Sequence, residues 1–311
     1  MRRAGSRGRG AVTLLTGAVL IATVAAACAS ASASDSGKIA AVGAESEYAN
    51  VISQIGGPYV AVSAVMSNPN TDPHTFEASP QVAQTVSAAR LVVQNGAGYD
   101  GFMNTVEAAT PSSTRRVIDV QSLLGLPAST ENPHLWYSPT TMPAVAQAIG
   151  KDLAAVAPSH AAYFTAEVTA LDTSLGPWTE AITALKSSFS GAPVATTEPV
   201  ADYLLQAAGL DDLTPWPFQA DIMNGVDPSA QDVSLEQAFF TGHQVKVFVY
   251  NQQVTDSLTQ SLLTLAQQNG IPVVGVYETM PTPGYDYQTW MVAEVNAVQQ
   301  ALARGVSTTR L

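Results

Sequence analysis

The chain is poor in cysteine, in histidine and in charged residues. It has one cysteine and four histidines in 311 residues, and 12% of its residues are charged. A single cysteine excludes a framework of internal disulfides, and the lack of paired thiolates argues against a structural zinc finger. With 46% hydrophobic and 7% aromatic residues, the composition is that of a globular protein long enough for one large domain or two ordinary ones.

Basic residues are scarce, and several of them lie at the N-terminus. The chain has 13 basic and 25 acidic residues, which gives a net charge of −12. Residues 1–27 hold four of the basic residues and none of the acidic ones, so the rest of the chain carries 9 minus 25, or −16. Such an excess of negative charge disfavours nucleic acid and anionic membrane surfaces as partners and favours a cationic ligand.

The N-terminal apolar run is shorter than the roughly 20 residues that a membrane-spanning helix needs. Its sequence is MRRAGSRGRG followed by AVTLLTGAVLIATVAAA. A basic start, a short apolar stretch and small residues at the end predict a signal peptide over residues 1–27. Cys28 follows directly, where bacterial lipoproteins are cleaved and lipidated, although Ala25 stands where leucine is usual. We predict a lipid anchor on Cys28, the alternative being an incidental free thiol, and a flexible tether over residues 28–37.

From residue 38 onward, apolar runs alternate with segments of helical periodicity. This pattern predicts an α/β fold with two Rossmann-like lobes, an N-terminal lobe over 38–139 and a C-terminal lobe over 191–311. Residues 140–190 show no strand pattern and predict a helical linker, in which one helix of about 30 residues is expected to bend at Gly176 and Pro177. Two lobes joined in this way predict a ligand site in the cleft between them.

Four potential metal ligands follow predicted strands or lie in the segment that leaves the first lobe: His74, His134, Glu198 and Glu278. Each alone has an ordinary interpretation, as a loop histidine or as an acid at a helix N-terminus. The carboxyl ends of parallel strands are where ligands bind, so together they predict a metal site. Two imidazoles and two carboxylates suit Zn²⁺, Mn²⁺ or Fe²⁺. Monodentate carboxylates would give a four-coordinate, zinc-like site and bidentate ones a manganese-like site, and the sequence leaves both open.

A metal-bound histidine normally donates its other ring N–H to a carboxylate or a carbonyl oxygen. The candidates for this partner are Asp72, Glu77 and the region of Asn132. Trp136 is two residues from His134 and could form a wall of the site or belong to the ordinary core.

Five motifs occur in a characteristic order: NTDPHTFEASP, ENPHLWYSP, VATTEPVADYLLQAAGL, DPSAQDV and IPVVGVYETMP. In this order the chain resembles, over residues 38–305, the metal-binding lipoproteins that serve manganese, zinc and iron ABC importers, the cluster A-I solute-binding proteins. The resemblance implies two α/β lobes joined by a long helix, with the metal between them. It also implies His74, His134 and Glu198 as the first three ligands. The family's fourth ligand is usually an aspartate, for which Glu278 is the nearest carboxylate here and Asp286 the alternative.

The function implied by the resemblance is capture of Mn²⁺ or Zn²⁺ outside the cytoplasmic membrane, with Fe²⁺ also compatible, and delivery to the permease of an ABC importer. A lipid-anchored monomer without enzymatic activity is expected. Glu198 and the lack of a His/Asp-rich loop between the histidines favour manganese, whereas the general order of metal affinities favours zinc. The alternatives are a metal-dependent hydrolase, which would need an open coordination position, and an adhesin or a siderophore-type binding protein on the same fold.

Overall fold

The structure is a computed structural model that describes residues 37–70 and 72–311. The predicted signal peptide, Cys28 and the tether up to residue 36 lie outside the described residues. The strands form two separate four-stranded parallel sheets. The strands of the first sheet are β1 (Ile39–Glu45), β2 (Val60–Met66), β3 (Leu91–Gln94) and β4 (Arg116–Asp119), and those of the second are β5 (Pro193–Thr196), β6 (Asp211–Asp212), β7 (Val247–Asn251) and β8 (Val273–Val276).

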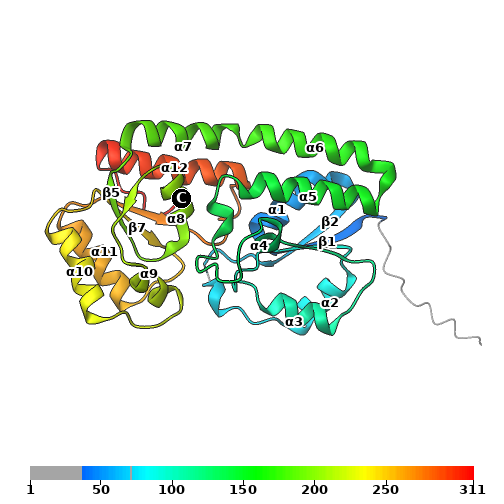
Figure 1. The fold of residues 1–311 in the computed structure, drawn as a ribbon, viewed down its shortest axis with the longest axis horizontal. Helices are drawn as coiled ribbons and strands as arrows, with labels where there is room; N and C mark the ends of the chain where they lie inside the picture. Colours follow the sequence, from blue (N-terminus) through cyan, green and yellow to red (C-terminus); the bar gives the residue numbers. More distant parts are fainter. Residues whose placement is uncertain (1–36, 71) are drawn as a thin grey trace, which may run out of the picture. The chain divides into compact units, whose positions relative to one another are not determined.

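The strand order is β2-β1-β3-β4 in the first sheet and β6-β5-β7-β8 in the second (Figure 1). Every residue of β3, β7 and β8 is buried, as expected for parallel strands covered on both faces. The predicted α/β fold with two parallel-sheet lobes is therefore confirmed. The α-helices are α1 (Ser46–Gly56), α2 (Pro80–Ala88), α3 (Phe102–Ala109), α4 (Val120–Leu123), α5 (Thr141–Val156), α6 (Ala161–Ser174), α7 (Gly176–Phe189), α8 (Asp202–Ala207), α9 (Trp216–Met223), α10 (Ala230–Thr241), α11 (Ser257–Gln268) and α12 (Tyr287–Arg304).

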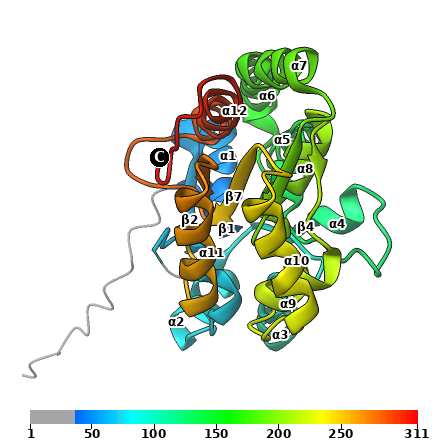
Figure 2. The ribbon, with the colours of Figure 1, turned by 90° about the vertical axis from the view of Figure 1, so that its left-hand side faces the viewer.

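The helix predicted to run for about 30 residues is interrupted where the sequence places Gly176 and Pro177. Helix α6 ends at Ser174 and α7 begins at Gly176, with Pro177 in its first turn. Proline fits there because the first N–H groups of a helix have no partner within the helix. The last helix, α12, packs along α7, and two perpendicular views place α6, α7 and α12 on the same side of the sheets (Figures 1 and 2). None of the described helices is long and apolar enough to cross a membrane.

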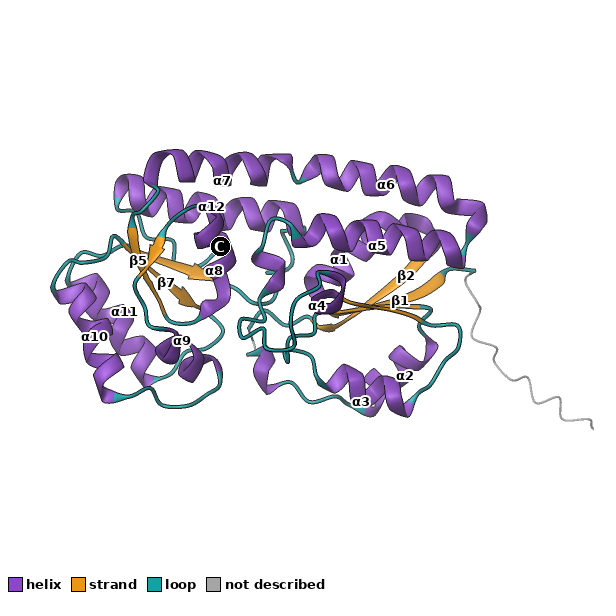
Figure 3. Cartoon of the chain, in the orientation of Figure 1, coloured by secondary structure: helices purple, strands orange, loops and turns teal. Residues whose placement is uncertain are grey.

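A continuous apolar core connects the two lobes. One cluster of buried side chains includes Tyr48 of α1, Trp178 of α7, Val249 of β7 and Trp290 of α12. The two sheets therefore share one core beneath the long helices. Figure 3 shows loops and short helical segments in the region between the two sheets.

Three elements of the structure have no clear apolar pattern in the sequence. Strand β6 has only two residues, and α4 has four. Helix α9 begins in a segment with prolines at positions 215 and 217. Periodicity cannot reveal elements shorter than about one turn, so the first two could not have been found in this way.

Candidate metal centre

The motif around His74 forms a capped turn. His74 lies in the 3₁₀-helix Pro73–Thr75 after β2, and the Asp72 side chain accepts a hydrogen bond of 2.8 Å from the His74 backbone N–H. Aspartate as N-cap and proline in the first helical position are both favoured at a helix start. The turn directs the imidazole inward, with 20% of its side-chain surface exposed.

His134 is fully buried, and its orientation is set by Asn132. The Asn132 Oδ1 accepts a hydrogen bond of 3.0 Å from the His134 backbone N–H, which identifies that atom as oxygen. The same oxygen lies 2.8 Å from His134 Nδ1, so Nδ1 carries the ring proton and donates it. The Nε2 lone pair of a neutral His134 then points to Glu278. This arrangement is the one that metal-binding histidines generally have.

Asn132 also connects the two lobes. Its Nδ2 donates to the Pro199 carbonyl oxygen at 2.8 Å, in the turn that follows Glu198, and Tyr203 donates to the Asn132 carbonyl oxygen at 3.0 Å. Of the three candidates for a partner of a histidine ring, the structure thus brings Asn132 to a ring nitrogen. Asp72 binds the backbone of His74, and Glu77 is exposed.

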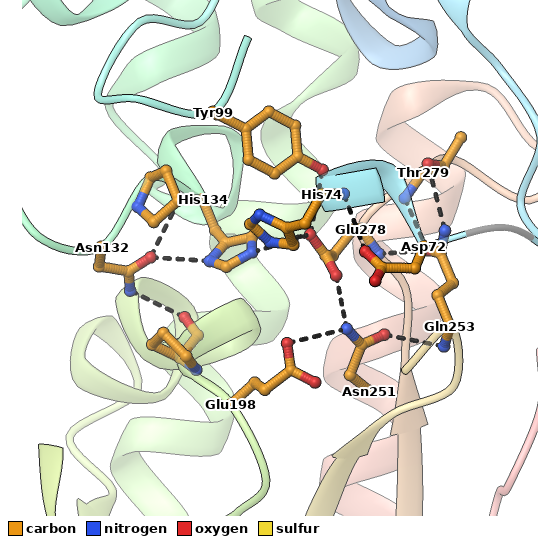
Figure 4. A network of polar contacts seen from close by, with 12 residues as sticks. Asp72, His74, Tyr99, Asn132, His134, Glu198, Asn251, Gln253, Glu278 and Thr279 are labelled. Carbon is orange, nitrogen blue, oxygen red and sulfur yellow. Dashed lines mark hydrogen bonds and ion pairs between the residues drawn. The ribbon is translucent and has the colours of Figure 1, made fainter. Parts of the chain in front are cut away.

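Glu278 is the point where the two histidines meet (Figure 4). It follows β8 by two residues and is 1% exposed. Its Oε2 lies 3.0 Å from His74 Nε2 and 3.1 Å from His134 Nε2, and it accepts a hydrogen bond of 3.1 Å from the Tyr99 hydroxyl. These ligand atoms of His74, His134 and Glu278 all lie within 4.8 Å of one another. Three potential ligands from two lobes therefore converge on one small volume.

Glu198 lies beside this group but does not join it. It follows β5 by two residues and is 3% exposed. Its Oε2 accepts a hydrogen bond of 3.2 Å from Asn251 Nδ2, while its Oε1 is buried without a partner. Asp286 lies elsewhere, at the N-cap of α12, where its side chain accepts from the Thr289 backbone N–H at 2.9 Å.

Burial and neighbouring charges shift the pKa values of the four candidate ligands in different directions. Burial raises the pKa of Glu198 well above its usual range, and the charge of Glu278 adds to this effect. Burial acts on Glu278 in the same direction, but His134 and His74, which donate hydrogen bonds and carry positive charge when protonated, outweigh it and hold the pKa of Glu278 below its usual value. Burial lowers the pKa of His134 and thus favours its neutral form. Burial would lower the pKa of His74 too, but the hydrogen bond and charge of Glu278 raise it.

These groups fit a divalent cation. A neutral His134 presents a lone pair to a carboxylate oxygen only 3.1 Å away, so a proton or a cation is needed between the two atoms. His74 Nε2 lies 3.0 Å from the same oxygen. Two imidazole nitrogens and a carboxylate oxygen are ligands that zinc and other divalent transition metals accept.

A cavity of about 340 Å³ reaches the group from outside. It is lined from the first lobe by His74, Gly98 and Tyr99, and from the second lobe by Trp216 and Met223 of α9. The cavity gives a small ion a route to the partly exposed face of His74.

A comparison with protein families shows to which family the chain belongs. A family model described as "Zinc-uptake complex component A periplasmic", ZnuA, matches residues 42–301, which is most of the chain. The chain belongs to this family. As a member of the ZnuA family it is a metal-binding, solute-binding protein and not an enzyme. A relative from Treponema pallidum (strain Nichols) is 21% identical over 272 residues, covering 81% of this chain and 84% of the relative.

Solved structures show the same fold as this ZnuA family member. The periplasmic zinc-binding protein TroA from Treponema pallidum is 19% identical, with a TM-score of 0.72 over 87% of this chain and 100% of TroA. A mutant of the laminin-binding adhesin Lmb from Streptococcus agalactiae is 19% identical, with a TM-score of 0.71 over 85% of this chain and 99% of Lmb.

The sequence interpretation missed two residues of the centre, Tyr99 and Asn251. Both follow the rule that was used for the other residues, since Asn251 ends β7 and Tyr99 lies in the loop after β3. They were missed because metal ligands and partners of the histidine rings were considered, whereas hydrogen-bond donors to the two carboxylates were not. A search of all strand ends for hydrogen-bonding side chains would have found them.

Proposed function

We propose that this chain captures a divalent transition metal, Mn²⁺ or Zn²⁺, outside the cytoplasmic membrane and delivers it to the permease of an ABC importer. The observation that carries the proposal is the convergence of His74 Nε2, His134 Nε2 and Glu278 Oε2 within 4.8 Å. The family description, a component of a zinc-uptake complex, supports transport as the purpose of binding.

Glu198 is the fourth ligand in this proposal. Its Oε1 is buried without a partner, and the charge of Glu278 raises the pKa of Glu198 in addition to burial. A divalent cation between the two carboxylates would relieve that repulsion. Asp286 is not part of the proposed ligand set, because its carboxylate is used in the capping box of α12.

The test is metal binding by matched histidine variants. We expect His74→Ala to lower the affinity for Zn²⁺ and Mn²⁺ by more than about 100-fold, since even a lost hydrogen-bond partner of a ligand costs 10- to 100-fold. His243→Ala is the control, because His243 is exposed and lies outside the group of three ligands. Elemental analysis and competition with a chromophoric chelator give the stoichiometry and affinity. Full-affinity binding by His74→Ala would refute the site.

The membrane attachment is a separate part of the proposal. Lipidation of Cys28 would hold the protein at the outer surface of the cytoplasmic membrane, with residues 28–37 as tether. Cys28→Ala should move the protein from the membrane fraction to the soluble fraction without changing metal affinity. Mass spectrometry of the mature N-terminus would show directly whether a lipid is attached.

Delivery to a permease is tested in cells. Deletion of the gene should lower uptake of zinc or manganese at limiting concentrations, and the wild-type gene should restore it. A His74→Ala gene should not restore uptake. Unchanged uptake in the deletion strain would count against the transport role and leave metal binding intact.

A further inference from the structure

The order of strands in the second sheet places an amide between two carboxylates. Strand β7 lies between β5 and β8, and its last residue, Asn251, pairs with Val276 of β8. Glu198 and Glu278 each follow the end of a neighbouring strand by two residues. Asn251 therefore lies between the two acids, as Figure 4 shows.

The orientation of the Asn251 amide is fixed by its neighbours. The Gln253 backbone N–H donates to Asn251 Oδ1 at 2.9 Å, and a backbone N–H can only donate. The amide nitrogen must therefore face the acids. The backbone N–H of Asn251 also donates to the Thr197 hydroxyl at 3.0 Å, and the residue is 1% exposed.

Asn251 Nδ2 binds one oxygen of each carboxylate. It donates to Glu278 Oε1 at 2.5 Å and to Glu198 Oε2 at 3.2 Å. What remains is Glu278 Oε2, which faces both imidazoles, and Glu198 Oε1, which is buried without a partner. Glu278 Oε2 also accepts a hydrogen bond of 3.1 Å from the Tyr99 hydroxyl. Each acid thus has one oxygen that the amide binds and one oxygen that the amide does not bind.

We propose that Asn251 is a specificity-determining residue that keeps both carboxylates monodentate, so that the site offers four ligand atoms and favours Zn²⁺ over Mn²⁺. This inference rests on the proposed function. Two imidazole nitrogens and two carboxylate oxygens match the tetrahedral coordination of zinc, whereas manganese is found in octahedral, oxygen-rich sites. For either acid to bind the metal through both oxygens, a buried N–H of Asn251 would lose its acceptor. The cost corresponds to about a tenfold to hundredfold loss of affinity for a metal bound in this way.

The chain offers a matched control for Asn251. Gln219 is another buried amide of the same lobe that joins two carboxylates, since its Nε2 donates to Asp212 at 2.9 Å and to Asp202 at 3.3 Å. Gln219 does not contact the histidines. Asn251→Leu and Gln219→Leu remove the same kind of group from the same kind of environment, but only Asn251→Leu frees the carboxylates at the metal centre.

The experiment measures zinc and manganese affinities by chelator competition and the coordination number of each bound metal by X-ray absorption. We expect four-coordinate zinc in the wild type. We expect Asn251→Leu to lower the ratio of zinc to manganese affinity by at least about tenfold and to raise the coordination number of manganese. Gln219→Leu should leave the ratio unchanged.

An unchanged ratio in Asn251→Leu, or bidentate carboxylates in the wild type, would overturn the inference while leaving metal capture intact. If Asn251→Leu does not fold, the wild-type coordination number alone decides. Failure of the wild type to bind either metal would instead refute the proposed function, and this inference with it.

Discussion

Replacing Asn132 tests how the orientation of one ligand is controlled. In Asn132→Ala, the acceptor for His134 Nδ1 is lost, together with the hydrogen bond from Asn132 to Pro199 in the other lobe. The imidazole itself remains and stays buried. The variant therefore separates the presence of the ligand from its orientation.

The expected magnitude follows from the contacts that are lost. Without the acceptor, the ring can carry its proton on Nε2, which removes the lone pair that faces Glu278 Oε2 at 3.1 Å. Loss of such a partner typically weakens metal binding by 10- to 100-fold, or about 1.4 to 2.8 kcal/mol. Asn132→Asp keeps an oxygen acceptor, so its affinity should stay much closer to that of the wild type.

The assay is titration of purified protein with Zn²⁺ in competition with a chelator of known affinity, with circular dichroism to verify the fold. Asn224→Ala is a suitable control, because Asn224 lines the same cavity but makes its side-chain hydrogen bond within α9, to the Ala220 carbonyl oxygen. If Asn132→Ala binds zinc within about twofold of the wild type while remaining folded, the assigned role of Asn132 is wrong.

Three further predictions concern stability. Burial raises the pKa of Glu294 from 4.5 to about 8, so the folded protein holds a proton that the unfolded chain releases above about pH 4.5. This group costs the folded protein no stability below about pH 4.5, and the unfolding free energy falls as the pH rises from there through about 8. Glu294→Gln should flatten this fall, measured in urea between about pH 5 and 8. Gly43→Ala should destabilise by about 1–3 kcal/mol, because its Cβ would lie 2.3 Å from the Ala49 backbone nitrogen, whereas Gly101→Ala, with open space around it, should change stability by about 0.5 kcal/mol or less in the same urea assay. Zinc at about 1,000 times its dissociation constant should stabilise the protein by about 4 kcal/mol, a gain that a chelator reverses in a thermal melt and that His74→Ala should lack.

The sequence predicts the fold class, and its candidate ligands include the three residues that the structure brings together, His74, His134 and Glu278. Alternation of strands and helices is a local property, and the rule that ligands follow strand ends points to His74, Glu198 and Glu278. His134 required the motif ENPH, because it follows no strand directly. These residues can be found without knowing the order of the strands in either sheet.

The role of Asn251 depends on the strand order, which the sequence does not contain in a local pattern. Only the order β5-β7-β8 brings the end of β7 between two acids. The assignment of Asn132 as a partner of His134 likewise depends on a loop conformation. By contrast, the position of Asp286 could have been read from the sequence, since Thr289 at the third following residue is a sign of a capped helix start.

The aromatic residues beneath the long helices have a consequence for unfolding. Trp136 and Tyr137 come from the segment that leaves the first lobe, and their partners come from α12. The Tyr287 hydroxyl donates to the Trp136 carbonyl oxygen at 2.5 Å, and the Tyr137 and Trp290 rings lie 5.7 Å apart.

Separating the halves would expose these large side chains to water, at a cost of several kcal/mol for each. Neither half is therefore expected to persist when the other unfolds. Although the chain has two sheets, denaturant should unfold residues 37–311 in a single cooperative transition, seen at the same midpoint by tryptophan fluorescence and by circular dichroism.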